Sequence, residues 1–168
     1  MKLGYVALAG HGETDAFLAG LAQHMQTRGL RLAGTVQINI DRDCGHLCDM
    51  DLMLLPDGPV VRISQDLGAG STGCRLDAGA LETAVALSRD RLAGADLLIV
   101  NKFGKHEAEG RGFRELIAEA LSRGLPVLTG VNSQNLAAFQ TFSDRAAERL
   151  SPDIDSVLTW TLAAAATA

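Results

Sequence analysis

The sequence predicts a three-layer α/β protein, in which a mostly parallel sheet is flanked by helices. Apolar, strand-like runs alternate with segments of helical periodicity along most of the 168 residues, the order expected of a parallel sheet covered on both faces. Residues 97–100 form a continuous apolar run, as in a strand buried on both faces. We therefore expect a single domain over residues 1–168, with a frayed tail at 161–168.

Start and stop signals separate the expected elements. Thr14 or Asp15 could cap the first helix, Gly29 ends it, and Asp77 caps a later helix. A Pro-Asp-Gly sequence at 56–58 lies between two short apolar runs and indicates a hairpin. The expected strands are 3–8, 32–40, 52–55, 59–63, 97–100 and 126–131; the expected helices are 14–28, 77–92, 113–123 and 134–150, with 154–162 as a last edge strand or short helix.

The composition argues against several classes of protein. A formal charge of −5 disfavours nucleic-acid binding, which needs a basic face. No apolar run approaches the length of a membrane span, and the first residues lack a basic segment followed by a long apolar run. Three cysteines, an odd number without a secretory signal, indicate reduced thiols. We expect a cytoplasmic protein with neither nucleic acid nor membrane as a partner.

The turn after the first strand has the frame of a phosphate-binding P-loop without its chemistry. The P-loop pattern is G-x-x-x-x-G-K-[ST], whose lysine neutralises phosphate. Here Gly10, Gly12 and Thr14 are present, but Ala7 replaces the first glycine and Glu13 replaces the lysine. Backbone N–H groups at the helix start could bind a smaller anion, although the Glu13 carboxylate opposes this. We do not expect tight triphosphate binding of the usual kind.

Residues 68–73 form a second glycine-rich segment, formally G-x-G-x-x-G. The dinucleotide fingerprint requires a helix that opens inside the glycine run, whereas the expected helix begins several residues later. Two interpretations stay open. The segment is either a plain loop or an anion-binding loop, in which Ser71, Thr72, Arg75 and Arg62 supply hydroxyl and guanidinium donors.

The segment 41–49 is rich in aspartate and in metal-ligating side chains. Cys44, His46 and Cys48, with Cys74 as a fourth ligand, could bind zinc or another soft metal. A structural zinc site usually shows a second close pair of ligands, and Cys74 stands alone. We favour the simpler interpretation of reduced thiols in a loop.

A polar segment follows the apolar strand at 97–100. It carries Asn101, Lys102, Lys105 and Arg111. In open α/β sheets, ligands bind at the carboxyl ends of the strands, so we expect these residues to face a ligand site. The plainer alternative is a solvated loop, in which the lysines pair with nearby glutamates at the surface.

The residues 101–107, N-K-F-G-K-H-E, resemble the end of the Walker B strand in the thermophile-type nucleoside-triphosphatases. That family carries an Asp-Glu pair followed by x-Gly-Lys-x-Glu. Gly104, Lys105 and Glu107 match, whereas Asn101 and Lys102 replace the acidic pair that would hold Mg²⁺ and activate water. The resemblance implies a P-loop-NTPase-like fold with degenerate Walker A and Walker B motifs.

A closer resemblance covers nearly the whole chain. It is to a bacterial family of unknown function that is related to those triphosphatases. The shared segments are S-Q-D-L-G-x-G-S-x-G-C-R-L-D (64–77), N-K-F-G-K-x-E-A-E-G-R-G-F (101–113) and P-V-L-T (126–129). Members are often encoded beside molybdate-transport and molybdoenzyme genes, so the resemblance implies a molybdenum context.

Our leading hypothesis is a non-hydrolysing protein that binds an oxyanion (molybdate or tungstate) or a phosphate-bearing molecule. It has an accessory role in molybdenum metabolism, with a molybdate transporter or a molybdoenzyme assembly protein as a possible partner. In this hypothesis Glu107 orients Lys105. The expected ligand contacts are Gly10, Gly12, Thr14, Arg62, Ser71, Thr72, Arg75, Asn101, Lys102, Lys105 and Arg111.

Two other functions stay open. A nucleoside-triphosphatase with an unusual site would need Glu107 or Glu13 as its base, and Mg²⁺ held by Thr14 and Asp66. Alternatively, the fold could serve as a docking module for a transporter or a molybdoenzyme chaperone. A free edge strand near Val157 would also permit a homodimer.

Overall fold

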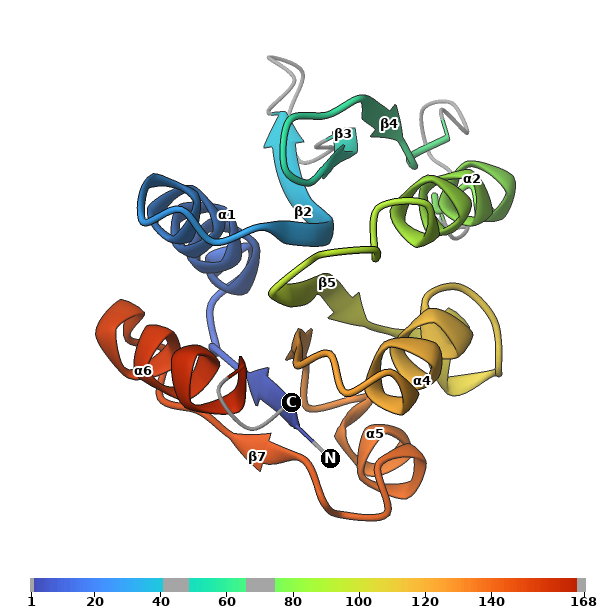
Figure 1. The fold of residues 1–168 in the computed structure, drawn as a ribbon. Coiled ribbons are helices and arrows are strands. Elements are labelled where there is room, and N and C mark those ends of the chain that lie inside the picture. Colours follow the sequence, from blue (N-terminus) through green and yellow to red (C-terminus); the bar gives the residue numbers. More distant parts are fainter. Residues whose placement is uncertain (1, 41–48, 66–74, 166–168) are drawn as a thin grey trace.

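The computed structural model describes residues 2–40, 49–65 and 75–165, which form thirteen helices and strands (Figure 1). The strands are β1 (Leu3–Val6), β2 (Leu32–Ile40), β3 (Asp49–Leu54), β4 (Val60–Arg62), β5 (Leu97–Phe103), β6 (Val127–Val131) and β7 (Glu148–Arg149). The helices are α1 (Glu13–Thr27), α2 (Ala78–Arg89), α3 (Lys105–Ala108), α4 (Arg114–Ser122), α5 (Leu136–Phe142) and α6 (Ile154–Ala165).

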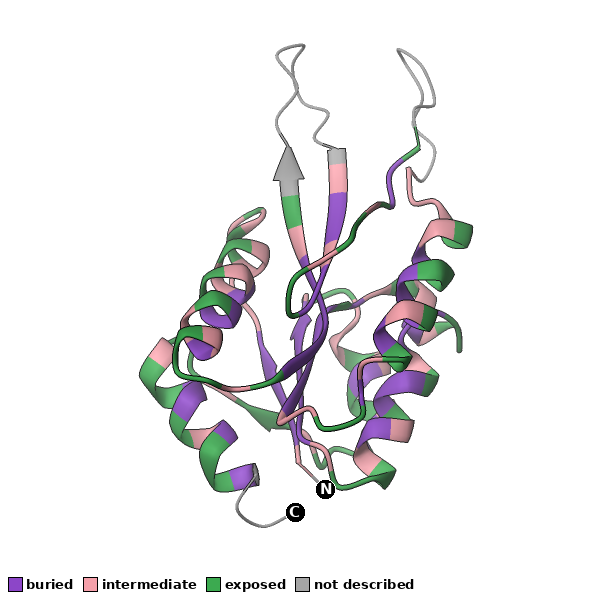
Figure 2. Ribbon diagram, turned by 45° about the horizontal axis from the view of Figure 1, so that its top comes forward, coloured by how far each residue is buried: buried purple, intermediate pink, exposed green. Residues whose placement is uncertain are grey.

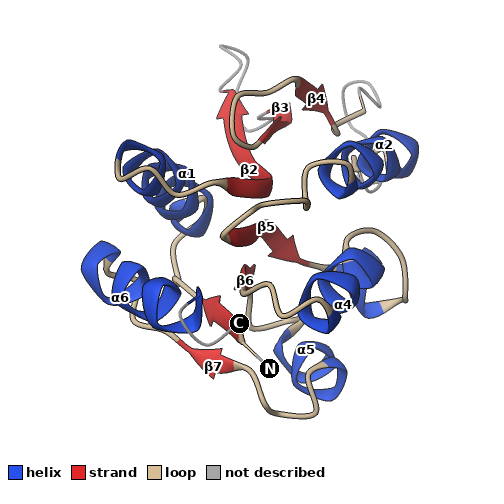
Figure 3. Ribbon diagram, in the orientation of Figure 1, coloured by secondary structure: helices blue, strands red, loops and turns tan. Residues whose placement is uncertain are grey.

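The strands form one sheet in the order β4-β3-β2-β5-β6-β1-β7 (Figure 3). The strands β2, β5, β6, β1 and β7 are parallel, and β3 and β4 add an antiparallel hairpin at one edge. The predicted mostly parallel sheet is therefore confirmed. In this order β1 lies between β6 and β7, so the glycine turn that follows β1 opens next to the ends of β6 and β5.

Helices cover both faces of the sheet. Helices α1 and α6 lie on one face, and α2, α4 and α5 lie on the other (Figure 1). The first face buries apolar side chains of α1 and α6 such as Leu18, Met25 and Val157. The second buries residues of the other helices, including Leu81 and Leu116. Figure 2 shows the buried residues gathered between the helices and along the central strands, as the three-layer prediction requires.

The last third of the chain differs from the predicted elements. The helix expected at 134–150 ends at Phe142, because Asp144 and Arg145 take left-handed backbone conformations with φ of 49° and 59°. The short strand β7 follows, with both residues exposed. A two-residue exposed strand has no apolar pattern, so the sequence did not predict it.

The segment after β7 is a helix, and the edge-strand interpretation is wrong. Val157 lies in α6 and is fully buried, so it offers no free edge for a second copy. The argument for a homodimer that rested on this residue therefore fails. The helix continues to Ala165, past the point where we expected the tail to fray, and Thr161 and Ala164 are buried.

A buried carboxylate organises the segment between β5 and α4. Glu107 is only 4% exposed, and its two oxygens accept hydrogen bonds from the backbone N–H groups of Gly104 (2.9 Å) and Phe113 (3.0 Å). Gly112 has a φ of 58°, and a Cβ atom there would lie 2.2 Å from Glu107 Oε1. The chain therefore folds around this side chain, which links the start of α3 to the start of α4.

An ion pair joins the segments that enter β2 and β5. The Arg31 guanidinium lies 2.8 Å from Asp96 Oδ1, and the Arg31 backbone N–H donates to Asp96 Oδ2, also at 2.8 Å. The Asp96 N–H donates in return to the Arg31 carbonyl at 2.7 Å. The hydrogen bonds from Arg31 hold the pKa of Asp96 below its usual value. This pair fixes the parallel register at the amino ends of the central strands.

We predict that Glu107→Ala destabilises the protein by about 1–3 kcal/mol, because one buried and one partly buried N–H group lose their acceptor. Glu107→Gln should lower the free energy of unfolding by a smaller amount, since its amide oxygen can still accept one of the two hydrogen bonds. Urea unfolding measures both effects. The matched control is Glu115→Gln at the exposed position in the first turn of α4; equal losses in the two Gln variants would contradict a structural role for Glu107.

We also predict that the contribution of Asp96 to stability depends on pH. A carboxyl whose pKa is lower in the folded state stabilises the protein above its unfolded pKa, which is about 3.9, and the effect is lost as the pH falls through the folded value. The wild-type protein should melt above Asp96→Asn at pH 7, and the gap should narrow below about pH 4. Thermal melts across this range check it, with the exposed Asp90→Asn as control; a gap that stays constant into acid would refute the assignment.

Candidate functional site

A cleft opens at the carboxyl edge of the sheet, where the sequence predicted a site. It consists of two adjoining pockets lined by described residues, of about 380 and 570 Å³. We call the smaller one, which includes Gly10, Gly12 and Thr14, the turn pocket, and the larger one, which includes Lys105 and Phe113, the side pocket. The residues common to both are Gln37, Met50, Arg75, Asn101, Lys102 and Asn132.

The glycine turn contains a carboxylate of the protein itself. Glu13 Oε2 accepts a hydrogen bond of 3.0 Å from the Gly10 N–H. A Cβ atom at Gly10 would lie 2.2 Å from the Glu13 carboxyl carbon, so the glycine provides the space for this contact. Gly12, with a φ of 75°, is the N-cap of α1 and makes no side-chain cap. The predicted caps, Thr14 and Asp15, therefore lie inside the first turn of the helix.

Thr14 lies in the turn pocket and packs closely against the sheet. Its hydroxyl oxygen accepts a hydrogen bond from the Leu8 N–H at 3.3 Å. A Cβ atom at Gly130 of β6 would lie 2.7 Å from the Thr14 methyl group and 2.6 Å from the Asn101 carbonyl oxygen. Because position 130 is glycine, α1 and β5 can both approach β6 at the base of the turn pocket.

The Asn101 side chain connects three elements at the base of the cleft. Asn101 is 3% exposed. Its amide oxygen accepts from the Gln37 N–H at 2.8 Å, and its amide nitrogen donates to Asp15 Oδ1 at 2.9 Å. The Gln37 side chain donates to the other Asp15 oxygen at 3.3 Å. Sequence reasoning placed Asn101 at the site but missed Asp15 and Gln37. The one feature that could have pointed to Asp15 and Gln37 is the general rule that a buried amide side chain needs hydrogen-bond partners.

Two cations lie where the pockets meet. Arg75 is half-buried and Lys102 is exposed, and both line both pockets. The Arg75 backbone carbonyl accepts from the Gln65 N–H at 2.6 Å, and the Arg75 Nε donates to the Gln65 carbonyl at 3.4 Å. The pairing with this neighbouring segment positions the Arg75 side chain. Lys102 is the exposed residue between the buried Asn101 and Phe103 of β5.

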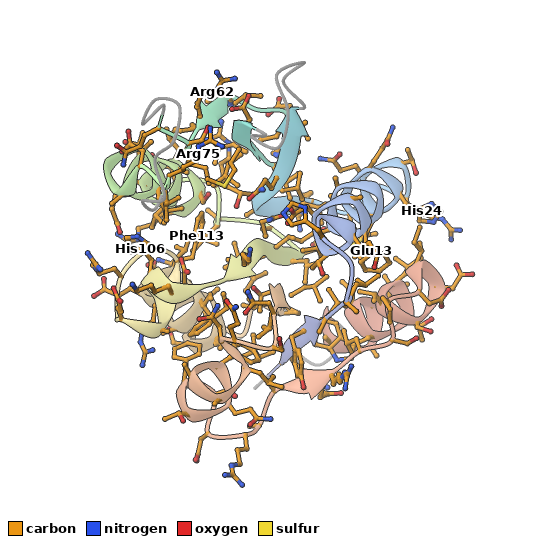
Figure 4. The ribbon with its side chains drawn as sticks, turned by 180° about the vertical axis from the view of Figure 1, so that it is seen from behind. Glu13, His24, Arg62, Arg75, His106 and Phe113 are labelled. Atoms are coloured by element: carbon orange, nitrogen blue, oxygen red, sulfur yellow. The ribbon has the colours of Figure 1, made fainter. Side chains whose placement is uncertain are left out.

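Arg62, another expected ligand contact, lies apart from the cleft. Arg62 lines neither pocket among the described residues, and it pairs across the β3–β4 hairpin with Asp51. The Arg62 Nε and Nη2 donate to the two Asp51 oxygens at 2.8 and 3.2 Å. Figure 4 shows Arg62 at the outer edge of the sheet, whereas Arg75 lies closer to the middle of the molecule.

The cations of the segment after β5 lie at the rim of the side pocket. Lys105 Nζ lies 3.8 Å from Glu109 Oε1, and Arg111 donates a hydrogen bond to Glu109. The Arg111 hydrogen bond and the charges of Lys105, Arg111 and His106 hold the pKa of Glu109 below its usual value. The expected pairing of Glu107 with Lys105 is wrong, because the Glu107 carboxylate faces backbone N–H groups.

Several predicted ligands lie outside the described residues. These are Ser71, Thr72, Asp66 and the four metal-ligand candidates Cys44, His46, Cys48 and Cys74. In the described part of the chain, no group of three or more His, Cys, Asp or Glu side chains could hold a metal ion. Within the same ranges, no helix is long and apolar enough to cross a membrane.

Comparisons with known proteins agree with this architecture. The solution structure of a human cancer-related nucleoside triphosphatase matches 95% of this chain and 96% of its own, with a TM-score of 0.67 and 16% identity. This similarity shows a P-loop-NTPase-like fold, as the sequence predicted.

A curated relative shares more of the sequence. The molybdenum import ATP-binding protein ModC 2 of Bradyrhizobium diazoefficiens is 38% identical over 132 residues, which are 78% of this chain. The match spans only 15% of the length of that relative.

The family comparison covers nearly the whole chain. Residues 3–160 match the model of the family described as "Protein of unknown function (DUF2478)". The matched range runs from β1 into α6, so it includes every element that lines the cleft. The chain belongs to the DUF2478 family.

Proposed function

We propose that the protein binds a small oxyanion or a phosphate-bearing molecule in the cleft and does not hydrolyse it. The observation that carries this proposal is the position of Arg75 and Lys102, which line both pockets at their junction. A guanidinium presents several donors in a fixed plane and suits tetrahedral oxyanions, while a lysine adds a compact positive charge. An anion at this junction would meet both cations.

The carboxylates around the cleft support binding without hydrolysis. A triphosphatase needs a group that orients the attacking water and carboxylates that hold Mg²⁺. Here Glu13 accepts from Gly10, and Asp15 accepts from Asn101 and Gln37. Glu107, the other candidate base, accepts from backbone N–H groups with both oxygens. These carboxylates hold the walls of the cleft together, which argues against a catalytic role.

The molybdenum part of the proposal rests on the curated relative. That protein is named for molybdenum import and ATP binding. We propose that this chain has an accessory role in molybdenum metabolism in the cytoplasm, with molybdate or tungstate as the oxyanion and a molybdate transporter or molybdoenzyme assembly protein as its partner. A nucleotide is the second candidate ligand, because the fold resembles a nucleoside triphosphatase and the relative is an ATP-binding protein.

We predict that Arg75→Ala and Lys102→Ala each weaken anion binding roughly tenfold or more, since each removes a charge-assisted contact. Isothermal titration with molybdate, tungstate, sulfate, phosphate and ATP–Mg²⁺ measures the affinities. The control is Arg28→Ala at the far end of α1, at the opposite edge of the sheet. Unchanged affinity in both cleft variants would contradict the proposed site. Release of phosphate from ATP or GTP by the wild-type protein would contradict the absence of hydrolysis.

We further predict that Glu13→Gln tightens the binding of phosphate-bearing ligands several-fold. The substitution keeps a side chain of the same length but removes the negative charge next to the Gly10 N–H. The same titrations check this, with the exposed Glu115→Gln as the charge-matched control. Equal affinities in wild type and Glu13→Gln would mean that the ligand does not approach the glycine turn.

A further inference from the structure

The side pocket extends well beyond the space that a bare oxyanion fills. Its volume of about 570 Å³ lies in the range of pockets for small organic molecules. One part of its lining, which we call the apolar wall, consists of the buried Leu52, Ile63, Leu81 and Phe113 and the half-buried Leu76. An anion bound only at the junction of the two pockets would leave the apolar wall in contact with water.

The charged part of the same lining is mostly basic. Among the described residues that line the side pocket are four lysine or arginine side chains and two carboxylates. Glu107 is 4% exposed, and both of its oxygens accept hydrogen bonds from backbone N–H groups. Glu109 pairs with two of the four cations. The other two cations, Arg75 and Lys102, lie at the junction with the turn pocket.

Two buried polar side chains of the lining offer little to a ligand. The Asn101 amide oxygen accepts from the Gln37 N–H, and its amide nitrogen donates to Asp15. Thr35 is fully buried, so a ligand in the pocket does not reach its hydroxyl. A nucleobase carries several hydrogen-bonding groups on its edge, and against the apolar wall these groups would lose water without gaining partners. A hydrocarbon chain has no such groups.

We infer that the ligand is an amphiphilic anion, with an acidic head at Arg75 and Lys102 and a short aliphatic tail against the apolar wall. This inference rests on the proposed function for the position of the head. The head is a phosphate or a carboxylate, since both accept charge-assisted hydrogen bonds from guanidinium and ammonium groups. The tail adds affinity through the apolar area that it removes from water, so its contribution grows with each methylene.

The test measures how the affinity depends on the length of the tail. Isothermal titration compares inorganic phosphate with methyl, butyl and hexyl phosphate, and also with hexanoate and hexanol. The affinity should rise roughly two- to fourfold for each methylene from methyl to hexyl phosphate. Hexyl phosphate or hexanoate should bind roughly tenfold or more tightly than hexanol, and the tighter of the two anions identifies the head group. This series uses the wild-type protein and needs no substitution.

A substitution in the apolar wall locates the tail. Leu76→Trp, at a half-buried position of the side pocket, should weaken hexyl phosphate roughly tenfold or more, because the larger side chain takes the space of the tail. The affinity for inorganic phosphate should stay within about twofold. The matched control is Leu125→Trp, at a half-buried position on the opposite edge of the sheet, which should change neither affinity.

The outcomes separate the two proposals. Equal affinities along the alkyl series, with phosphate binding that still depends on Arg75, would contradict the inference and leave the anion site intact. If neither phosphate nor any alkyl phosphate binds, both proposals fail. Hexanol that binds as tightly as hexyl phosphate would overturn the role of the head. AMP is the last comparison: if it binds more tightly than hexyl phosphate and loses this advantage in Leu76→Trp, a base occupies the side pocket and the aliphatic tail is refuted.

Discussion

The cleft depends on the hydrogen bonds of one buried amide. Asn101 lies near the end of β5 and joins this strand to β2 through the Gln37 N–H and to α1 through Asp15. These three elements form the base on which the turn pocket and the side pocket meet. A buried amide can hold two elements only when both its donor and its acceptor are satisfied. Both are satisfied here, so the spacing between β2, β5 and α1 is fixed at the point where Lys102 and Arg75 face the cleft.

The carboxylates near the cleft share a structural task. Glu107 binds the backbone at both ends of the segment between β5 and α4, and Asp15 holds two amide side chains. In each case N–H groups donate hydrogen bonds to a negatively charged carboxylate, and such charge-assisted hydrogen bonds are strong. These hydrogen bonds therefore connect the elements that surround the cleft.

The regular elements of the fold could be predicted because their signals are local. The apolar run at 97–100 predicted a buried strand and lies in β5. Asp77 was the predicted N-cap of a helix, and its side chain accepts a hydrogen bond from the Ala80 N–H at the start of α2. The short strand β7 could not be predicted, since its two residues are exposed. The end of α5 could not be predicted either, because the left-handed backbone conformations there belong to Asp144 and Arg145 and not to glycine.

The site could be predicted only in part, for a related reason. The sequence named Arg75 and Lys102 as expected ligand contacts, and both line the cleft. The sequence could not show which side chains hydrogen-bond to each other. Asp15 and Asn101 are 86 residues apart, and no spacing rule connects them. Arg62 looked like an anion ligand because it is a cation near a glycine-rich segment, but the register of the β3–β4 hairpin places it opposite Asp51.

The Glu13 carboxylate competes with any external anion for the Gly10 N–H in the glycine turn. Glu13 is attached to the helix whose first turn it occupies, so its concentration near the Gly10 N–H is set by the chain and does not fall on dilution. An external anion must displace this side chain or bind beside it, in both cases against a negative charge. Anions that offer only charge are at a disadvantage, and molecules with further contacts elsewhere in the cleft can overcome it.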